Sequence, residues 1–196
     1  MIYSKLRLVA LGFLASSSLL SDCAPVLGSE GPDSGDARQT KPATEAGRLV
    51  RVVDGDTYDV LTGGVVVRMR LLGVDAPERD QPFGVQATDS VTRLLPVGSP
   101  VRLTRVGLDL YGRTLGTVRL PVAGHYLALD SLLVVRGWGW AAAANRKPVI
   151  RAAQQAVAEQ SRRGLWKCGL TNAVSPKLWR SFNASTKRRL RGSCTW

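Results

Sequence analysis

The chain has 196 residues, enough for one domain with a hydrophobic core plus terminal segments. Its 27 lysines and arginines against 15 aspartates and glutamates give a formal net charge of +12, which indicates a polyanionic partner, either nucleic acid or an anionic membrane surface. The alternative to a polyanionic partner is a basic surface that only interacts with solvent. The single histidine and the lack of a CxxC motif exclude a metal site built from histidine and cysteine pairs.

The N-terminus is typical of an export signal. Lys5 and Arg7 precede LVALGFLASSSLL, which has the length of a signal-peptide apolar region and is short for a membrane span. Cys23 in LLSDC is a candidate for lipid attachment, although Asp22 stands where bacterial lipoprotein sites carry a small residue. An uncleaved membrane anchor is the alternative. We therefore expect a signal at 1–23, a flexible linker at 24–47, and an exported protein that is secreted or attached to the cell envelope.

Five short strands follow the linker, with order expected from about Leu49. The apolar or alternating segments are 48–55, 56–62, 65–74, 101–106 and 113–120. Asp-Gly and Gly-Gly pairs mark tight turns between the first three. Because helices are too few for parallel crossovers, this pattern predicts a small antiparallel barrel.

Three helices are predicted at 84–98, 127–137 and 147–164, each with Gly or Pro near its end. In the first, one face carries Val85, Thr88, Val91 and Leu95. In the third, an apolar stripe is expected to pack into the core. Its members are Val149, Ala152, Ala153, Ala156 and Val157.

Carboxylates gather at the ends of the predicted strands, at Asp54, Asp56, Asp75 and Glu78. Strand ends from distant segments meet at one rim of a small barrel, so we expect these side chains to lie together. Carboxylates placed together repel unless a cation joins them, and a hard divalent ion such as Ca²⁺ suits oxygen ligands. An ordinary Asp-Gly turn is the alternative explanation for the first two.

Two arginines accompany these acids. Arg70 lies within an apolar run, where an unpaired guanidinium is costly, so it requires a carboxylate or a bound phosphate. Arg113 follows a Tyr-Gly turn at the start of a strand. Two guanidiniums beside a carboxylate-bound cation suit phosphoryl chemistry, with Glu78 as the acceptor of a proton from water. A structural salt bridge from Arg70 to Glu78 or Asp75 is the alternative.

The motifs VDGDT, RLLGVDAPE and DLYGR, in this order, resemble the staphylococcal nuclease (thermonuclease) family from about Leu49 to Trp166. The resemblance implies an α+β, mainly β, fold: a five-stranded antiparallel OB-fold barrel with three helices, forming a nuclease domain at 48–167. It also implies Ca²⁺-dependent cleavage of DNA and RNA without base specificity, leaving 3′-phosphates.

The resemblance also implies roles for the site residues. Asp56 and Asp75 would be carboxylate ligands of Ca²⁺, and the main-chain carbonyl of Ala76 would be a third ligand. Glu78 would be the general base, and Asp54 would lie next to the ligand residues without contacting the ion itself.

Arg70 and Arg113 would hold the phosphate, with Arg113 also near the leaving oxygen, and Tyr111 would hydrogen-bond the terminal phosphate of a bound nucleotide.

Several positions depart from the family pattern. Ala76 replaces a threonine and Leu110 replaces a lysine, while WAAAAN lacks tyrosines that contact the nucleotide, leaving Ala143 and Asn145. The lysine-bearing loop after the acidic motif is shortened to RDQPFG. Base stacking contributes roughly 1–3 kcal/mol per base, so we expect weaker binding of short nucleotides.

Beyond the resemblance, Cys168 and Cys194 flank the basic C-terminal tail at 168–196 and would form a disulfide in an oxidising compartment; two free thiols are the alternative. The tail either binds phosphates and stacks its aromatic rings on bases, or is disordered.

The sequence leads us to expect a monomer that takes nucleic acid as substrate. Two other functions stay open: a non-catalytic OB module that binds nucleic acid or an envelope partner, and a basic lipoprotein with a structural role in the envelope.

Overall fold

The computed structural model describes residues 42–143 and 149–196. The predicted export signal, Cys23, most of the predicted linker and Asn145 lie outside the described residues. Within the described ranges, no helix combines the length and the apolar character needed to cross a membrane.

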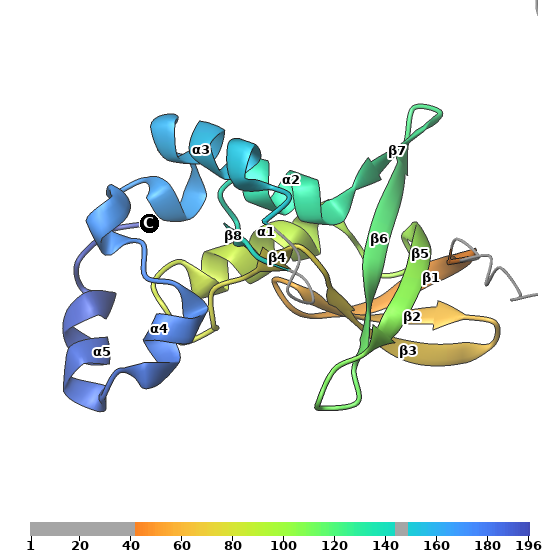
Figure 1. Cartoon of the computed structure of the whole chain (residues 1–196), viewed down its shortest axis with the longest axis horizontal. Helices are drawn as coiled ribbons and strands as arrows, with labels where there is room; N and C mark the ends of the chain where they lie inside the picture. Colours follow the sequence, from red (N-terminus) through yellow and green to blue (C-terminus); the bar gives the residue numbers. More distant parts are fainter. Residues whose placement is uncertain (1–41, 144–148) are drawn as a thin grey trace, which may run out of the picture. The chain divides into compact units, whose positions relative to one another are not determined.

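Five strands close into a barrel, which confirms the predicted fold class (Figure 1). They are β1 (Thr44–Asp54), β2 (Thr57–Thr62), β3 (Val65–Leu71), β5 (Pro100–Leu108) and β6 (Thr114–Val122). Sheet neighbours are antiparallel except for the closing pair, in which β3 runs parallel to β6 with Met69 opposite Thr114.

Two features of the strands differ from the sequence prediction. β1 begins at Thr44, before Leu49 and inside the predicted linker, because Thr44 to Arg48 pair with β5. A sixth strand, β7 (His125–Ala128), extends the sheet beyond β6. Its residues are mostly exposed, so it lacks the alternating pattern by which the other strands were predicted.

The barrel interior is filled by side chains from all of its strands. Tyr58, Val60, Met69 and Leu103 are fully buried, and Val118 nearly so. Helix α1 (Gly84–Leu94) covers this core with Ala87, Thr88 and Val91, whereas Val85, predicted to share a face with Thr88 and Val91, is 48% exposed. The core therefore holds in place the strand ends from which the site is built.

The prediction that the apolar stripe of the third helix packs into the core was wrong. Helix α3 (Ala152–Gln160) buries only Ala158, while Val149 and Val157 are exposed. Polar contacts join α3 to α2 (Leu129–Val135) and to β8 (Trp140–Ala141): Arg151 pairs with the buried Asp130, and Gln155 accepts a hydrogen bond from the backbone of Ala141. The buried Ala158 packs with Leu165 and Trp166, while the other contacts of the helix are an ion pair at its N-terminus and amide hydrogen bonds, which apolar periodicity does not detect.

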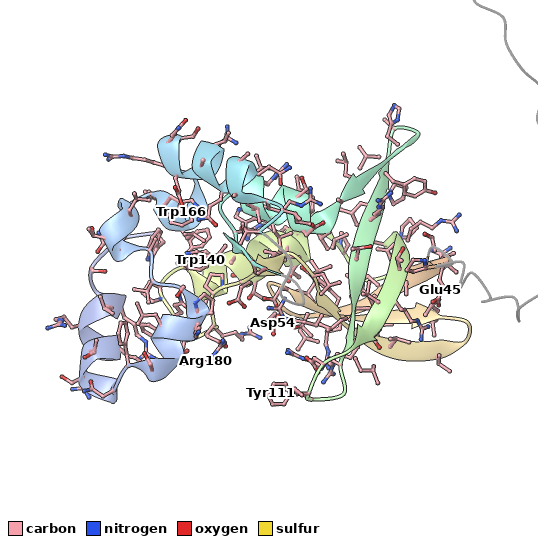
Figure 2. All side chains as sticks on the ribbon, in the orientation of Figure 1. Glu45, Asp54, Tyr111, Trp140, Trp166 and Arg180 are labelled. Atoms are coloured by element: carbon pink, nitrogen blue, oxygen red, sulfur yellow. A yellow bond between two sulfur atoms is a disulfide. The ribbon has the colours of Figure 1, made fainter. Side chains whose placement is uncertain are left out.

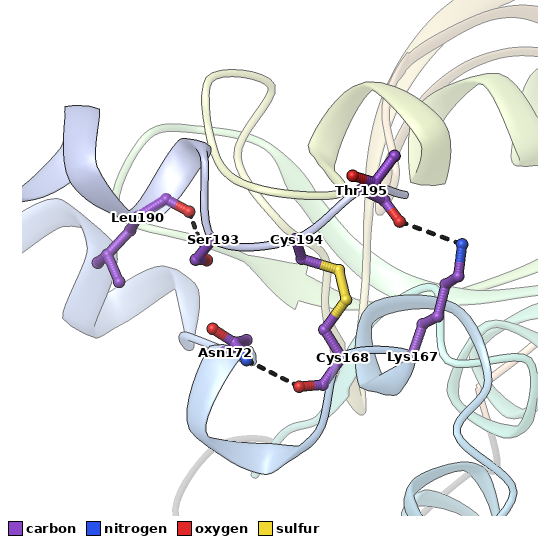
Figure 3. The surroundings of a disulfide bond; sticks show 7 residues. All are labelled: Lys167, Cys168, Asn172, Leu190, Ser193, Cys194 and Thr195. Atoms are coloured by element: carbon purple, nitrogen blue, oxygen red, sulfur yellow. Dashed lines mark hydrogen bonds between the residues drawn. A yellow bond between two sulfur atoms is a disulfide. The ribbon is translucent and has the colours of Figure 1, made fainter.

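The segment from 168 to 196 is folded in the structure. It contains α4 (Pro176–Ser181) and α5 (Ala184–Arg191), whose first turns are capped by the side chains of Ser175 and Asn183. Short 3-10 turns, η1 (Gly164–Trp166) and η2 (Leu170–Asn172), lead into it. A disulfide joins Cys168 to Cys194 across Cα atoms 6.0 Å apart, closing the segment into a loop (Figure 3).

Replacing Tyr58 by Phe should destabilise the protein, because the buried Tyr58 hydroxyl donates a 2.6 Å hydrogen bond to the carbonyl of Gly55. Without the hydroxyl, the carbonyl of Gly55 stays buried and has lost its hydrogen-bond donor, at a cost of about 1–3 kcal/mol. Urea unfolding measures the change in the free energy of unfolding. Tyr126→Phe is the matched control, since Tyr126 is half exposed. Equal effects of the two substitutions would contradict the assigned contact.

Candidate active site

A cavity of about 420 Å³ lies at one rim of the barrel and brings all eight predicted site residues together. Figure 2 labels two of its lining residues, Asp54 and Tyr111. The lining residues are Asp54, Asp56, Arg70, Asp75, Ala76, Pro77, Glu78, Tyr111, Arg113 and Arg180. Their assembly shows that segments distant in sequence share one site, whereas the individual roles stay predictions.

The turn between β1 and β2 carries the first acids. The backbone N–H of Asp56 donates to Asp54 Oδ1 at 3.0 Å, which fixes the turn. Asp56 Oδ2 in turn accepts a 2.7 Å hydrogen bond from the backbone of Ala76, beside β4 (Val74–Asp75). Gly55 permits this approach, because a Cβ there would lie 2.6 Å from the Cβ of Ala76. The turn thus connects two motifs, which an ordinary hairpin turn would not do.

Arg70 contacts carboxylates from both motifs at once. Its Nε lies 3.1 Å from Asp56 Oδ1, and its Nη2 donates to Asp75 Oδ1 at 2.9 Å. Nη1 donates to the backbone carbonyls of Leu71 and Val74 at 2.7 and 2.8 Å. The guanidinium that required a partner therefore has two aspartates, and Glu78 is not one of its partners in this structure.

Burial dominates the electrostatics of these aspartates. It raises the pKa of Asp56 to about 7, against the opposing effect of Arg70 and with a further rise from Asp54. Burial also raises the pKa of Asp75, while Arg70 and Arg180 act in the opposite direction. Without an additional positive charge, the ionised forms of Asp56 and Asp75 are thus disfavoured, and a bound cation would favour them.

The donor set fits a hard divalent cation. Among the residues that the structure describes, no three His, Cys, Asp or Glu side chains are grouped as a ready metal site. The expected set needs only two carboxylates, from Asp56 and Asp75, with the carbonyl of Ala76, and Ca²⁺ completes its oxygen shell with water. The fit rests on the buried carboxylate of Asp56 with its raised pKa and on the guanidinium that it shares with Asp75.

Glu78 lines the same cavity as Asp56 and Asp75, and it lies at the start of the loop that leads to α1. Its carboxylate forms an ion pair with Arg180, and its backbone N–H donates to Gln81 Oε1 at 3.1 Å. Helix α1 begins directly against this loop, since a side chain on Gly84 would clash with the carbonyl of Glu78. The position of Glu78 is therefore set by its backbone, while its carboxylate is partly exposed.

Arg113 enters the cavity from the turn between β5 and β6. Asp109 Oδ2 accepts a 2.6 Å hydrogen bond from Arg113 Nε, and its other oxygen accepts from the backbone N–H groups of Tyr111 and Arg113. The guanidinium lies 5.6 Å from the centre of the Tyr111 ring, which is 85% exposed. Arg113 is therefore oriented by its own turn, and it lines the same cavity as the two aspartates.

A smaller hollow of about 280 Å³ adjoins Tyr111 and Arg113. Leu110, Ala142 and Ala143 contribute apolar side chains to its lining, and Leu110 is fully exposed. These are the positions where the sequence departs from the family pattern, so this part of the surface offers apolar contact in place of lysine and tyrosine side chains.

Arg180 is the lining residue that sequence reasoning missed. It lies in α4, and its partner Glu78 is 102 positions away in the sequence. The adjacent Trp179 was the only local signal, as an aromatic residue among basic ones in KLWRSF that proves to be fully buried.

Comparison with known proteins agrees with the fold and the assembled motifs. The family model described as staphylococcal nuclease homologue matches residues 68–168. An endonuclease of Escherichia coli O157:H7 is 38% identical over 135 residues, covering 68% of this chain and 84% of the relative. A micrococcal nuclease of Shigella flexneri is 35% identical over 141 residues, covering 68% and 79%. A thermonuclease of Staphylococcus hyicus is 40% identical over 81 residues, covering 37% and 47%.

The fold and the site define a nuclease, a hydrolase of phosphodiester bonds. The chain belongs to the staphylococcal nuclease family. Nucleic acid is the substrate class that this family implies. The comparisons favour an enzyme over the two non-catalytic functions that composition left open.

Asp56→Asn should stabilise the metal-free protein more at about pH 8 than at about pH 5. Because folding raises the pKa of Asp56 from 3.8 to about 7, the parent loses stability as pH rises through that interval, and the amide does not ionise. Thermal unfolding in EDTA gives the difference between variant and parent at each pH.

Asp59→Asn is the control, since hydrogen bonds from Arg68 lower the pKa of Asp59 and place its titration below this window. Its effect should be the same at both pH values. A pH-independent effect of Asp56→Asn would contradict the electrostatic assignment.

Proposed function

We propose that the protein is an exported, Ca²⁺-dependent nuclease that cleaves DNA, RNA or both without base specificity and leaves 3′-phosphates. The observation that carries the proposal is the contact of Asp56 and Asp75 with one guanidinium, in a cavity that also holds Glu78 and Arg113. Acidic ligands, a base and a phosphate-binding cation are what hydrolysis of a phosphodiester requires.

The carboxylates of Asp56 and Asp75 and the carbonyl of Ala76 would hold the Ca²⁺ ion, which would polarise the phosphoryl oxygens when bound. Asp54 keeps the Asp56 turn in place by accepting the backbone N–H of Asp56. Arg70, which contacts both aspartates, would bind the phosphate together with the ion.

Glu78 accepts a proton from the attacking water as the new bond to phosphorus forms. The bond from phosphorus to the 5′-oxygen breaks, so the phosphate stays on the 3′ side. The leaving oxygen takes up a proton from solvent, and Glu78 returns its proton to solvent. Arg113 neutralises charge on the phosphoryl group and near this leaving oxygen, with its orientation held by Asp109.

Cleavage without base specificity is supported by the hollow beside Tyr111. Leu110, Ala142 and Ala143 present apolar side chains there. Base identity is distinguished mainly by hydrogen bonds to base edges, which such side chains cannot make.

Export is supported by the charged and apolar N-terminal sequence and by the disulfide between Cys168 and Cys194, a bond that persists in oxidising compartments. Lipid attachment at Cys23 would hold the enzyme at the envelope. We propose that it acts as a monomer, with the whole cavity supplied by one chain.

Full-length protein should cleave single-stranded DNA with Ca²⁺ and be inactive in EDTA, and Glu78→Gln should lower kcat by about 10²–10⁴-fold because the proton acceptor is lost. Glu159→Gln is the matched control, as Glu159 lies on α3 and does not line the cavity.

Gel analysis of the products measures the rate, and phosphatase treatment detects the 3′-phosphate. Equal cleavage in Ca²⁺ and EDTA, or an active Glu78→Gln variant, would overturn the proposed mechanism.

A further inference from the structure

The disulfide-closed C-terminal segment supplies a third guanidinium to the cavity. Arg180 lines it together with Asp54 and Tyr111, and Figure 2 shows these three side chains coming from separate parts of the chain. Arg180 lies C-terminal to the stretch at 68–168 that matches the family model. Its contribution is therefore separate from the predicted set of acids and arginines.

The segment docks on the loop that carries Glu78, so the position of Arg180 is built into the fold. Trp179 is fully buried, and its Nε1 donates to Asp80 Oδ1 at 2.9 Å. Arg191 Nη2 donates to Asp80 Oδ2 at 2.8 Å, and Gln81 Nε2 donates to the carbonyl of Val174. The shortened loop RDQPFG thus serves as the platform for α4, and α4 aims Arg180 at the neighbouring Glu78.

The contact between Arg180 and Glu78 is suited to exchange. Their side chains are 58% and 39% exposed, and an ion pair at that exposure is weak because solvent screens it. Arg70 and Arg113 are less exposed, at 16% and 32%. Of the three guanidiniums, Arg180 is therefore the one that gives up the weakest existing contact when it binds an anion.

The net charge of the cavity also supports a role for Arg180 in binding an anion. Four carboxylates face three guanidiniums, a net charge of −1 when all are ionised. A bound divalent cation would change this to +1, and without Arg180 the loaded cavity would be neutral. A nucleic-acid strand carries one negative charge per phosphate, so the excess positive charge supplied by Arg180 favours its binding.

We propose that Arg180 binds a phosphate of the nucleic-acid strand next to the one being cleaved, and that its guanidinium moves from Glu78 to this phosphate when the strand binds. The exchange leaves the Glu78 carboxylate free to accept the proton from water. This inference rests on the proposed function, because it assigns a second phosphate position to the same site.

The test compares parent, Arg180→Gln and the control Arg188→Gln, which removes an equal charge from an exposed position of α5. For a single-stranded oligonucleotide, Arg180→Gln should raise KM about ten-fold, the size expected for loss of one charged hydrogen bond. For a small ester with a single phosphodiester group, KM should not rise, as the ester has no neighbouring phosphate, and kcat should not fall, because Glu78 is no longer paired with Arg180. Arg180→Lys, which keeps the charge, should restore part of the loss.

Binding to a fluorescent oligonucleotide in EDTA separates this inference from the proposed function. There Arg180→Gln should weaken affinity and reduce the slope of log affinity against log salt by about 0.7, the value for one phosphate contact on a single strand. If the parent binds but never cleaves, the proposed function fails while the binding comparison still tests Arg180. A higher kcat on both substrates in Arg180→Gln would identify an inhibitory contact, and unchanged KM and salt slope would exclude phosphate binding; either result overturns the inference.

Discussion

The shared contact of Arg70 with Asp56 and Asp75 is the interaction on which the site depends. A guanidinium that is 16% exposed binds two carboxylates from separate motifs and two backbone carbonyls of its own segment. Removing one partner from such a buried group leaves uncompensated charge, which is costly. The same contact that stabilises the rim also keeps the two aspartates beside one another, as joint coordination of an ion would require.

The closure of the barrel explains why the motifs meet. In the parallel pair of β3 and β6, Arg70 lies opposite Leu115, so the start of β6 with Arg113 reaches the rim where β3 continues towards Asp75. The turn at Asp54 and Asp56 reaches the same rim through the pairing of β2 with β3. Residues from three motifs are thus brought to one rim by the backbone pairing of the strands.

The barrel strands and the meeting of the acids at one rim could be predicted because their signals are local: Asp-Gly turns, alternating strands and acids at strand ends. Ala76 and Tyr111 were assigned by resemblance to the family alone. The packing of α3 could not be predicted, since it buries only the small Ala158 and is otherwise held by the contact of Arg151 with Asp130 and by amide hydrogen bonds, which leave no apolar pattern. Arg180 could not be predicted either. Its place in the site depends on Trp179 docking against Asp80, a contact across 99 sequence positions.

Calorimetric titration of the full-length protein with Ca²⁺ tests the central claim most directly, that Asp56 and Asp75 act on a single cation. The account predicts that the parent binds one ion and that Asp75→Asn loses this binding, while Asp89→Asn, at an exposed position of α1, retains it. Equal Ca²⁺ affinity in the parent and Asp75→Asn would show that the shared contact with Arg70 is a structural ion pair and that the cation site lies elsewhere.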